Sequence, residues 1–248
     1  MTDVYKAPAG DLSGSSQPGL VLGSLQKGIA GEYDFSISAV LAEAWEKTDG
    51  SKGKIWIAFA LYLAVFIPMT LCLHIFLGDD WFGDGLRVVV MRCVDVSLSA
   101  GISMLGVKLA VGAPVESNEV YQHIEKAVQF VVAAILMAAM VAAGTILLVL
   151  PGIYLFFSYL LVTMLIAEKK LQPWQALEAS RKALTHHWFK IFFLAVAYAV
   201  IVLVSALPAG IGLIWTLPMG AIIRGIVYRT VFGYEASTEG APLQPKLS

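Results

Sequence analysis

The chain alternates between long apolar runs and shorter polar segments over most of its length. A helix that crosses the ~30 Å hydrocarbon core of a bilayer needs roughly 20 apolar residues. Six runs approach this length, and very short links join two pairs of them into expected antiparallel hairpins, the first with a tight turn at Pro151-Gly152. The predicted spans cover residues 55–77, 86–111, 130–150, 153–167, 191–207 and 211–232.

Three further segments carry apolar residues at helical spacing but are too polar to span a bilayer. They cover residues 38–48, 120–130 and 173–188, and each pattern is typical of an amphipathic helix lying among lipid headgroups. Each segment precedes an apolar run that ends near a proline, which suggests three copies of an interfacial helix followed by a pair of spans. We therefore predict an all-α membrane protein with six transmembrane helices, about three interfacial helices and a three-fold internal repeat.

Composition supports the membrane class independently of the pattern. Hydrophobic residues make up 58% of the 248 residues and charged residues only 14%, whereas a soluble domain is about half apolar and about a quarter charged. The net charge of −1 gives no reason to expect nucleic acid as a partner. Residues 1–35 and 233–248 are polar and rich in Gly, Ser or Pro, so we expect flexible cytoplasmic tails there.

The distribution of basic residues predicts the orientation in the membrane. Cytoplasmic loops of membrane proteins carry an excess of Lys and Arg. With the N-terminus inside and six spans, 15 of the 17 basic residues lie in or next to cytoplasmic segments, and the first outer loop is acidic. An odd number of spans would scramble this division. Both ends are therefore expected in the cytoplasm.

Ionisable residues within the second predicted span are the first candidates for a functional site, because charge at membrane depth is costly and usually functional. Arg92 and Asp95 are three residues apart and share one helix face with Ser99 and Ser103. One interpretation is a substrate or proton relay in a cavity. The other is an internal ion pair near the outer interface, with the side chain of Arg87 reaching the headgroups.

Small residues form a stripe on the same helix at Ser99, Ser103, Gly106 and Ala110. Such stripes let membrane helices approach closely. The contact they predict lies either inside one chain or between two copies in a homo-oligomer.

The residues give no support for catalysis, a cofactor or a metal. None of the motifs typical of hydrolases, proteases or nucleotide-binding enzymes is present. The adjacent His186 and His187 point to different faces of a helix, so they are poor joint metal ligands. Cys72 and Cys93 lie in apolar runs and are expected to be buried thiols.

The most distinctive segment is residues 147–194. A Pro-Gly pair, an apolar return helix, a polar break and an amphipathic helix that enters the next span follow one another there. This order resembles the YciC family of bacterial inner-membrane proteins and is similar to the membrane domain of some glycerophosphodiester phosphodiesterases. The positions that match the family pattern are Pro151, Gly152, Glu168, Ala176, Ser180 and Trp188.

The resemblance implies a multi-pass protein of the bacterial inner (plasma) membrane linked to envelope and lipid homeostasis. We expect it to carry no enzymatic activity over, because the 248 residues contain no phosphodiesterase domain. We expect a non-enzymatic protein whose partners are membrane lipids, a membrane protein or a second copy of the chain. The alternative is a small-solute or lipid transporter or channel that uses Arg92 and Asp95.

Overall fold

The computed structural model describes residues 23–78 and 80–234, and this part of the chain forms helices and no β-strand. In chain order the helices are α1 (Leu25–Ala30), α2 (Ile37–Phe76), α3 (Trp81–Val111), the 3₁₀ turns η1 (Ser117–Tyr121) and η2 (Ile124–Lys126), α4 (Ala127–Leu147), α5 (Val149–Ser158), α6 (Val162–Lys169), α7 (Pro173–His186), α8 (Trp188–Ala206) and α9 (Leu213–Phe232).

Five of the described helical segments are long and apolar enough to cross a membrane: α2, α3, η1 to α4, α5 to α6, and α8. This confirms the all-α, membrane-type fold class. The sixth predicted span, residues 211–232, forms α9, which contains Arg224 and Arg229 and is largely buried among the other helices. The number of six spans therefore stays a prediction.

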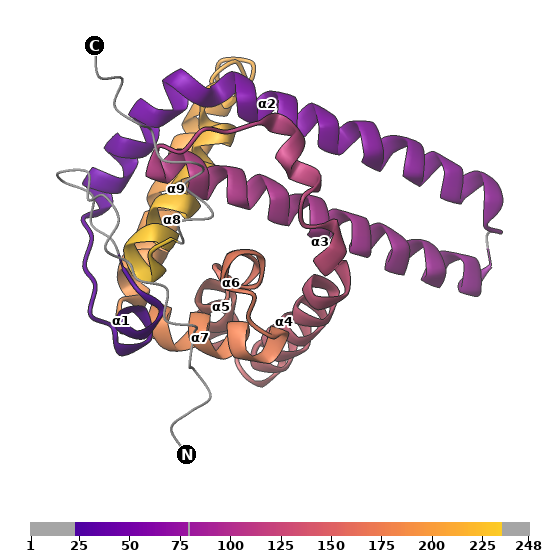
Figure 1. The fold of residues 1–248 in the computed structure, drawn as a ribbon. Coiled ribbons are helices and arrows are strands. Elements are labelled where there is room, and N and C mark those ends of the chain that lie inside the picture. The colour runs from indigo at the N-terminus through magenta and orange to yellow at the C-terminus, as the bar shows by residue number, and fades with distance from the viewer. Residues whose placement is uncertain (1–22, 79, 235–248) are drawn as a thin grey trace, which may run out of the picture.

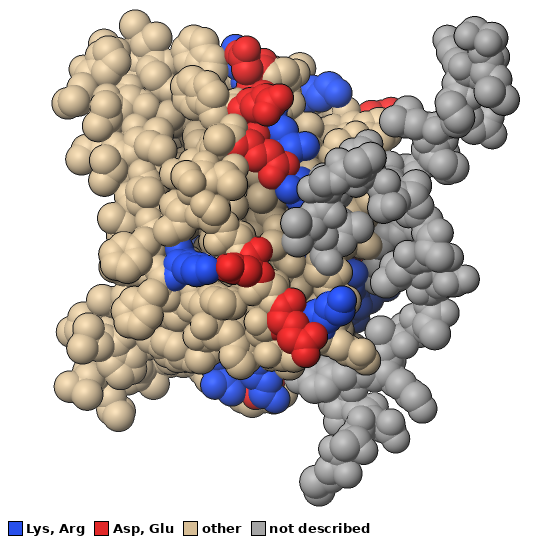
Figure 2. All heavy atoms as spheres, turned by 90° about the vertical axis from the view of Figure 1, so that its left-hand side faces the viewer, with Lys and Arg blue, Asp and Glu red and all other residues tan. Residues whose placement is uncertain are grey.

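Buried side chains concentrate in one part of the molecule, which we call the base. It consists of α1, the first half of α2, the second half of α3, α6, α7 and α9. Beyond the base, the far ends of α2 and α3 extend as a two-helix hairpin whose apolar side chains are exposed (Figure 1). On the face in Figure 2, charged side chains gather toward one side, and the other side shows none. Helix ends with exposed apolar side chains, and a base with charged side chains on its surface, are the expected division for a membrane protein.

Helices α3 and α9 cross in backbone contact within the base. A β-carbon on Gly106 would lie 2.2 Å from the carbonyl oxygen of Ala221, and one on Gly225 would lie 2.2 Å from that of Gly106. Glycine at both positions is what permits this distance. Ser103, Gly106 and Ala110 of the predicted stripe are buried at this side of α3, whereas Ser99 is exposed. Three of the four small residues thus pack inside the chain.

The first predicted interfacial helix is not a separate element. Residues 38–48 are the first turns of α2, which continues without interruption for 40 residues. Gly50 and Gly53 lie between the amphipathic and apolar parts, but a helix tolerates glycine at a cost of about 1 kcal/mol each. Val40, Ala44 and Thr48 form a buried stripe on this part of α2, which packs against α9. Burial against protein explains the amphipathic pattern there.

The second predicted interfacial helix, residues 120–130, is also wrong as an α-helix. The chain makes the two 3₁₀ turns η1 and η2, and α4 begins only at Ala127. Val120 is fully buried, and its carbonyl oxygen would be 2.2 Å from a β-carbon on Gly101 of α3. We attribute the irregular turns to this tight contact, which overrides the helical periodicity. The third segment does form a separate helix, α7.

The turn between the third and fourth predicted spans lies earlier than expected. The helix breaks at Leu148, whose backbone is extended, and Pro151 sits in the first turn of α5, where a missing N–H costs nothing. The return span, predicted over residues 153–167, is itself interrupted by turns at residues 159–161, between α5 and α6.

The N-terminal tail predicted over residues 1–35 does not extend to residue 35. Residues 25–30 form α1, which packs against α7 and α9. After it, the Tyr33 hydroxyl donates to the carbonyl of Ala183 at 2.9 Å. Burial raises the pKa of this phenol. Residues 1–22 and 235–248 of the two predicted tails lie outside the described residues.

Cys72 is exposed rather than buried, because it faces outward on the α2–α3 hairpin.

Candidate functional site

The predicted pair Arg92 and Asp95 forms, but on the outer surface of the α2–α3 hairpin. The Arg92 guanidinium lies 3.4 Å from one carboxylate oxygen of Asp95, and 73% of the Arg92 side chain is exposed. The hydroxyl of Tyr62 on α2 donates to the other carboxylate oxygen at 2.8 Å. The ion pair lies within α3, and the bond from Tyr62 links it to α2. This favours the interpretation as an ion pair within one helix over the interpretation as a relay in a cavity.

Ser99 and Ser103 do not complete a polar site with that pair. Each hydroxyl donates to a backbone carbonyl of its own helix, Ser99 to Val96 at 3.0 Å and Ser103 to Ser99 at 2.9 Å. None of the four predicted residues lines either of the two cavities described below.

The positions that carry the family resemblance have structural contacts in and beside the base. A β-carbon on Gly152 would lie 2.0 Å from the hydroxyl oxygen of Thr145, so glycine lets α5 approach α4. The Ser180 hydroxyl donates at 2.7 Å to the carbonyl of Ser158, which the break after α5 leaves without its helical partner. Trp188 and Glu168 also form hydrogen bonds. The indole N–H of Trp188 donates to the carbonyl of Tyr154, and the carboxylate of Glu168 accepts from the hydroxyl of Tyr228.

A cavity of about 310 Å³ lies where the base meets the hairpins. Five segments line it: α2, α3, the break between α5 and α6, α8 and α9. Its wall is almost wholly apolar and consists of Ile55, Trp56, Phe59, Ile102, Leu160, Ile191, Leu194, Ala195, Tyr198, Leu217, Pro218, Gly220, Ala221, Ile223, Arg224 and Val227. Ligand sites of proteins are typically cavities of roughly 300–1,000 Å³ with a few placed polar groups.

Proline and glycine shape the α9 side of this cavity. Pro218 has no N–H to donate to the carbonyl of Ile214 one turn earlier, and the indole N–H of Trp56 donates to that carbonyl instead, at 2.8 Å. Two residues further along, Gly220 makes room for the ring of Tyr198, whose hydroxyl oxygen would be 2.3 Å from a β-carbon there. Irregular backbone is tolerated in membrane proteins where it is buried or lines a cavity.

Arg224 supplies the positive charge of this cavity. Its Nε donates to the carbonyl of Gly220 at 3.3 Å. Its two terminal amino groups have no hydrogen-bond or ion-pair partner among the described residues. Of the described residues that line the cavity, Arg224 is the only charged one.

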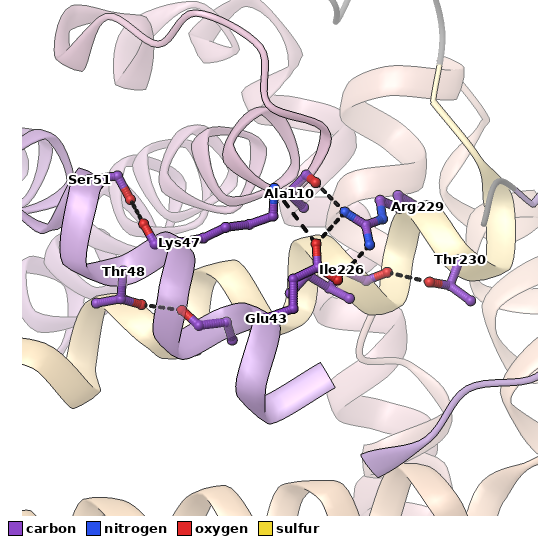
Figure 3. A network of polar contacts seen from close by, with 9 residues as sticks. Glu43, Lys47, Thr48, Ser51, Ala110, Ile226, Arg229 and Thr230 are labelled. Carbon is purple, nitrogen blue, oxygen red and sulfur yellow. Dashed lines mark hydrogen bonds and ion pairs between the residues drawn. The ribbon is translucent and has the colours of Figure 1, made fainter. Parts of the chain in front are cut away.

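The other arginine of α9 has partners for both terminal amino groups and serves as a contrast. Figure 3 shows the guanidinium of Arg229 facing the carboxylate of Glu43 from α2. Each terminal nitrogen donates to a carboxylate oxygen at 2.7 Å. The same guanidinium donates to the carbonyl of Ala110 at the end of α3. This contact holds α2, α3 and α9 together. Only 7% of the Arg229 side chain is exposed, so the pair is structural.

A second cavity, of about 260 Å³, lies between α3, the η1–η2 segment and α6, and it is polar. Several of its charges are already satisfied within the protein. Lys108 lies 2.9 Å from Glu119, and the ammonium of Lys126 donates to the carbonyl of Ala167 at 2.7 Å. We interpret this cavity as part of the polar packing around the base rather than as a binding site.

Sequence reasoning missed the apolar cavity and Arg224. In the charge count Arg224 was only one of the basic residues next to a cytoplasmic segment. The available signal was its position in the middle of an apolar run, close after a proline and a glycine. No pattern along the chain shows that five separate segments meet there.

The comparisons give no relative from which a function could be transferred. Comparison of the chain with protein-family models, with curated proteins and with solved structures finds no match.

Proposed function

We propose that this protein is a non-enzymatic protein of the bacterial inner membrane that supports envelope or lipid homeostasis by binding a membrane lipid. The observation that carries the proposal is the apolar cavity between α2, α8 and α9. Its wall would favour an alkyl chain over a hydrated solute, since burial of apolar surface contributes roughly 25 cal/mol per Å². The exposed apolar ends of the hairpins leave lipid as the surrounding solvent from which such a chain would enter.

The surface position of Arg92 and Asp95 favours lipid binding over transport through those residues. A transport site is expected at a cavity between helices, near the middle of the membrane. Most of the Arg92 side chain is exposed, and neither residue lines the described cavities. The resemblance of Pro151, Gly152, Glu168, Ser180 and Trp188 to the bacterial inner-membrane family agrees with the proposed location.

Native mass spectrometry of the purified full-length protein tests lipid binding. We expect the wild type to retain a copurified lipid mass. The A195F variant places a phenyl ring in the cavity wall and should lose that mass. The matched control is A138F, on an exposed face of α4, which should retain it. If the wild type carries no lipid, and deletion of the gene leaves lipid composition and envelope stress unchanged, the proposal is wrong.

The orientation with both ends in the cytoplasm belongs to the same proposal. It requires α9 to cross the membrane, although α9 is the least apolar of the six predicted spans and is not among the five segments apolar enough by composition. Green fluorescent protein fused after residue 248 should fluoresce, and alkaline phosphatase fused there should be inactive. The reverse pattern would mean five crossings.

A further inference from the structure

The two arginines of α9 differ in one respect that points to a ligand. Arg229 is neutralised by Glu43, whereas Arg224 faces an apolar cavity and has no carboxylate partner among the described residues. An isolated charge in apolar surroundings is unfavourable unless it is paired and hydrogen-bonded. The missing counter-charge would come from whatever occupies the cavity.

We infer that the occupant is a single-chain lipid with one negative charge, of the fatty-acid class, whose carboxylate pairs with Arg224. The inference rests on the proposed lipid-binding function and specifies its ligand. The guanidinium has two terminal amino groups free to donate, and a carboxylate accepts two parallel bonds from such a fork. The alkyl chain would lie against the apolar wall formed by Ile55, Phe59 and Leu194.

Charge and volume both limit the occupant. One cation among the described lining residues matches a monoanion better than a dianionic phosphate monoester. A volume of about 310 Å³ lies at the lower limit for ligand sites, so it suits one alkyl chain and not two. A two-chain phospholipid with one negative charge matches the charge but not the volume, and it is the main competing occupant to be tested.

The experiment uses the full chain in nanodiscs of zwitterionic phosphatidylcholine and a photoactivatable diazirine analogue of hexadecanoate. Photolysis followed by peptide mapping should label α8 and the part of α9 around residues 217–227. Unlabelled hexadecanoate should compete at least tenfold better than hexadecan-1-ol, which has the same chain but no charge, and better than dipalmitoyl phosphatidylglycerol.

Substitutions then test the role of the charge. Because a hydrogen bond to a charged group contributes roughly 1.5–3 kcal/mol, R224Q should weaken hexadecanoate binding about tenfold to a hundredfold. R224K keeps the charge without the fork and should weaken it less. The matched control is R92Q, which removes the exposed arginine of α3 and should not change binding.

The outcomes separate this inference from the proposed function. If A195F abolishes labelling, but R224Q binds hexadecanoate like the wild type or hexadecan-1-ol competes equally well, the cavity binds lipid without regard to charge and the inference fails. Preferential competition by phosphatidylglycerol also overturns it. If neither the wild type nor A195F is labelled in the cavity, the proposed function fails as well. Should R224Q not give monodisperse protein, R224K and the competition series on the wild type decide.

Discussion

The pair between Glu43 and Arg229 is the contact whose loss should damage the base most selectively. The E43Q variant keeps the size of the side chain and removes its charge, so Arg229, whose side chain is only 7% exposed, loses its counter-ion. Breaking a fully buried pair costs about 3–5 kcal/mol. Because Glu43 is 29% exposed and the carbonyl of Ala110 remains as an acceptor, we expect about 2–3 kcal/mol.

Thermal unfolding in nanodiscs, followed by tryptophan fluorescence, measures this effect. For a chain of this length, 1 kcal/mol shifts the midpoint by about 2–4 °C, so E43Q should unfold about 4–12 °C below the wild type. The control is K47Q, because the ammonium of Lys47 lies 3.6 Å from the same carboxylate but both side chains are partly exposed. That pair should contribute under about 1 kcal/mol.

A double substitution tests whether an uncompensated buried charge causes the loss of stability. If the cost of E43M comes from an uncompensated charge, the E43M/R229M protein should be more stable than E43M alone, because two apolar side chains leave no buried charge. Equal losses from E43Q and K47Q, or no recovery in the double variant, would show that the pair does not hold α2 against α9.

Three further predictions concern packing, pH and a hydrogen bond to an irregular helix. G106V should lower stability by about 3 kcal/mol in the same unfolding assay, whereas G50A, with no neighbour within 4 Å of its new β-carbon, should not lower it. The hydrogen bond from Lys190 lowers the pKa of the Asp34 carboxyl, so the stabilisation it gives is present above the unfolded-state pKa and lost as pH falls through the folded-state value. The difference in melting temperature between wild type and D34N should therefore vanish at acid pH, and a difference that persists there would contradict this. W56F removes the donor to α9 and should cost about 1 kcal/mol, and a melting temperature equal to that of the wild type would refute it.

Most helices of the fold could be predicted from apolar runs because each satisfies its own backbone hydrogen bonds. The ends of α4 and α8 lie within three residues of the predicted spans. Helix α2 was divided wrongly because an amphipathic pattern is the same whether the apolar face meets lipid headgroups or another helix. Only the position of α9 decides between the two, and α9 lies about 170 residues away along the chain.

The irregular segments could not be predicted because tertiary contacts determine them. Val120 packs its backbone against Gly101, and the break between α5 and α6 is stabilised by the Ser180 hydroxyl. In both cases the partner is distant in sequence, and the local pattern alone favours a continuous helix.

The candidate site shows the same limit. The spacing of Arg92 and Asp95 correctly predicted that they pair, because both lie on one helix. Spacing along one helix cannot show which face the other helices cover, so it could not show that the pair is exposed.

The two arginines of α9 show why charge in an apolar helix has to be interpreted together with its neighbours. They are five residues apart, about 7.5 Å along the helix axis, and sequence gives them the same significance. Helix α2 supplies a carboxylate to one of them, and this contact fixes the base. At the position of the other, α2 instead presents Ile55, Trp56 and Phe59, which form an apolar wall around a cation. A helix that only held the bundle together would gain nothing from a second charge without a carboxylate partner, since an apolar side chain there would need no counter-ion. The presence of an arginine at the cavity is therefore better explained by binding than by packing.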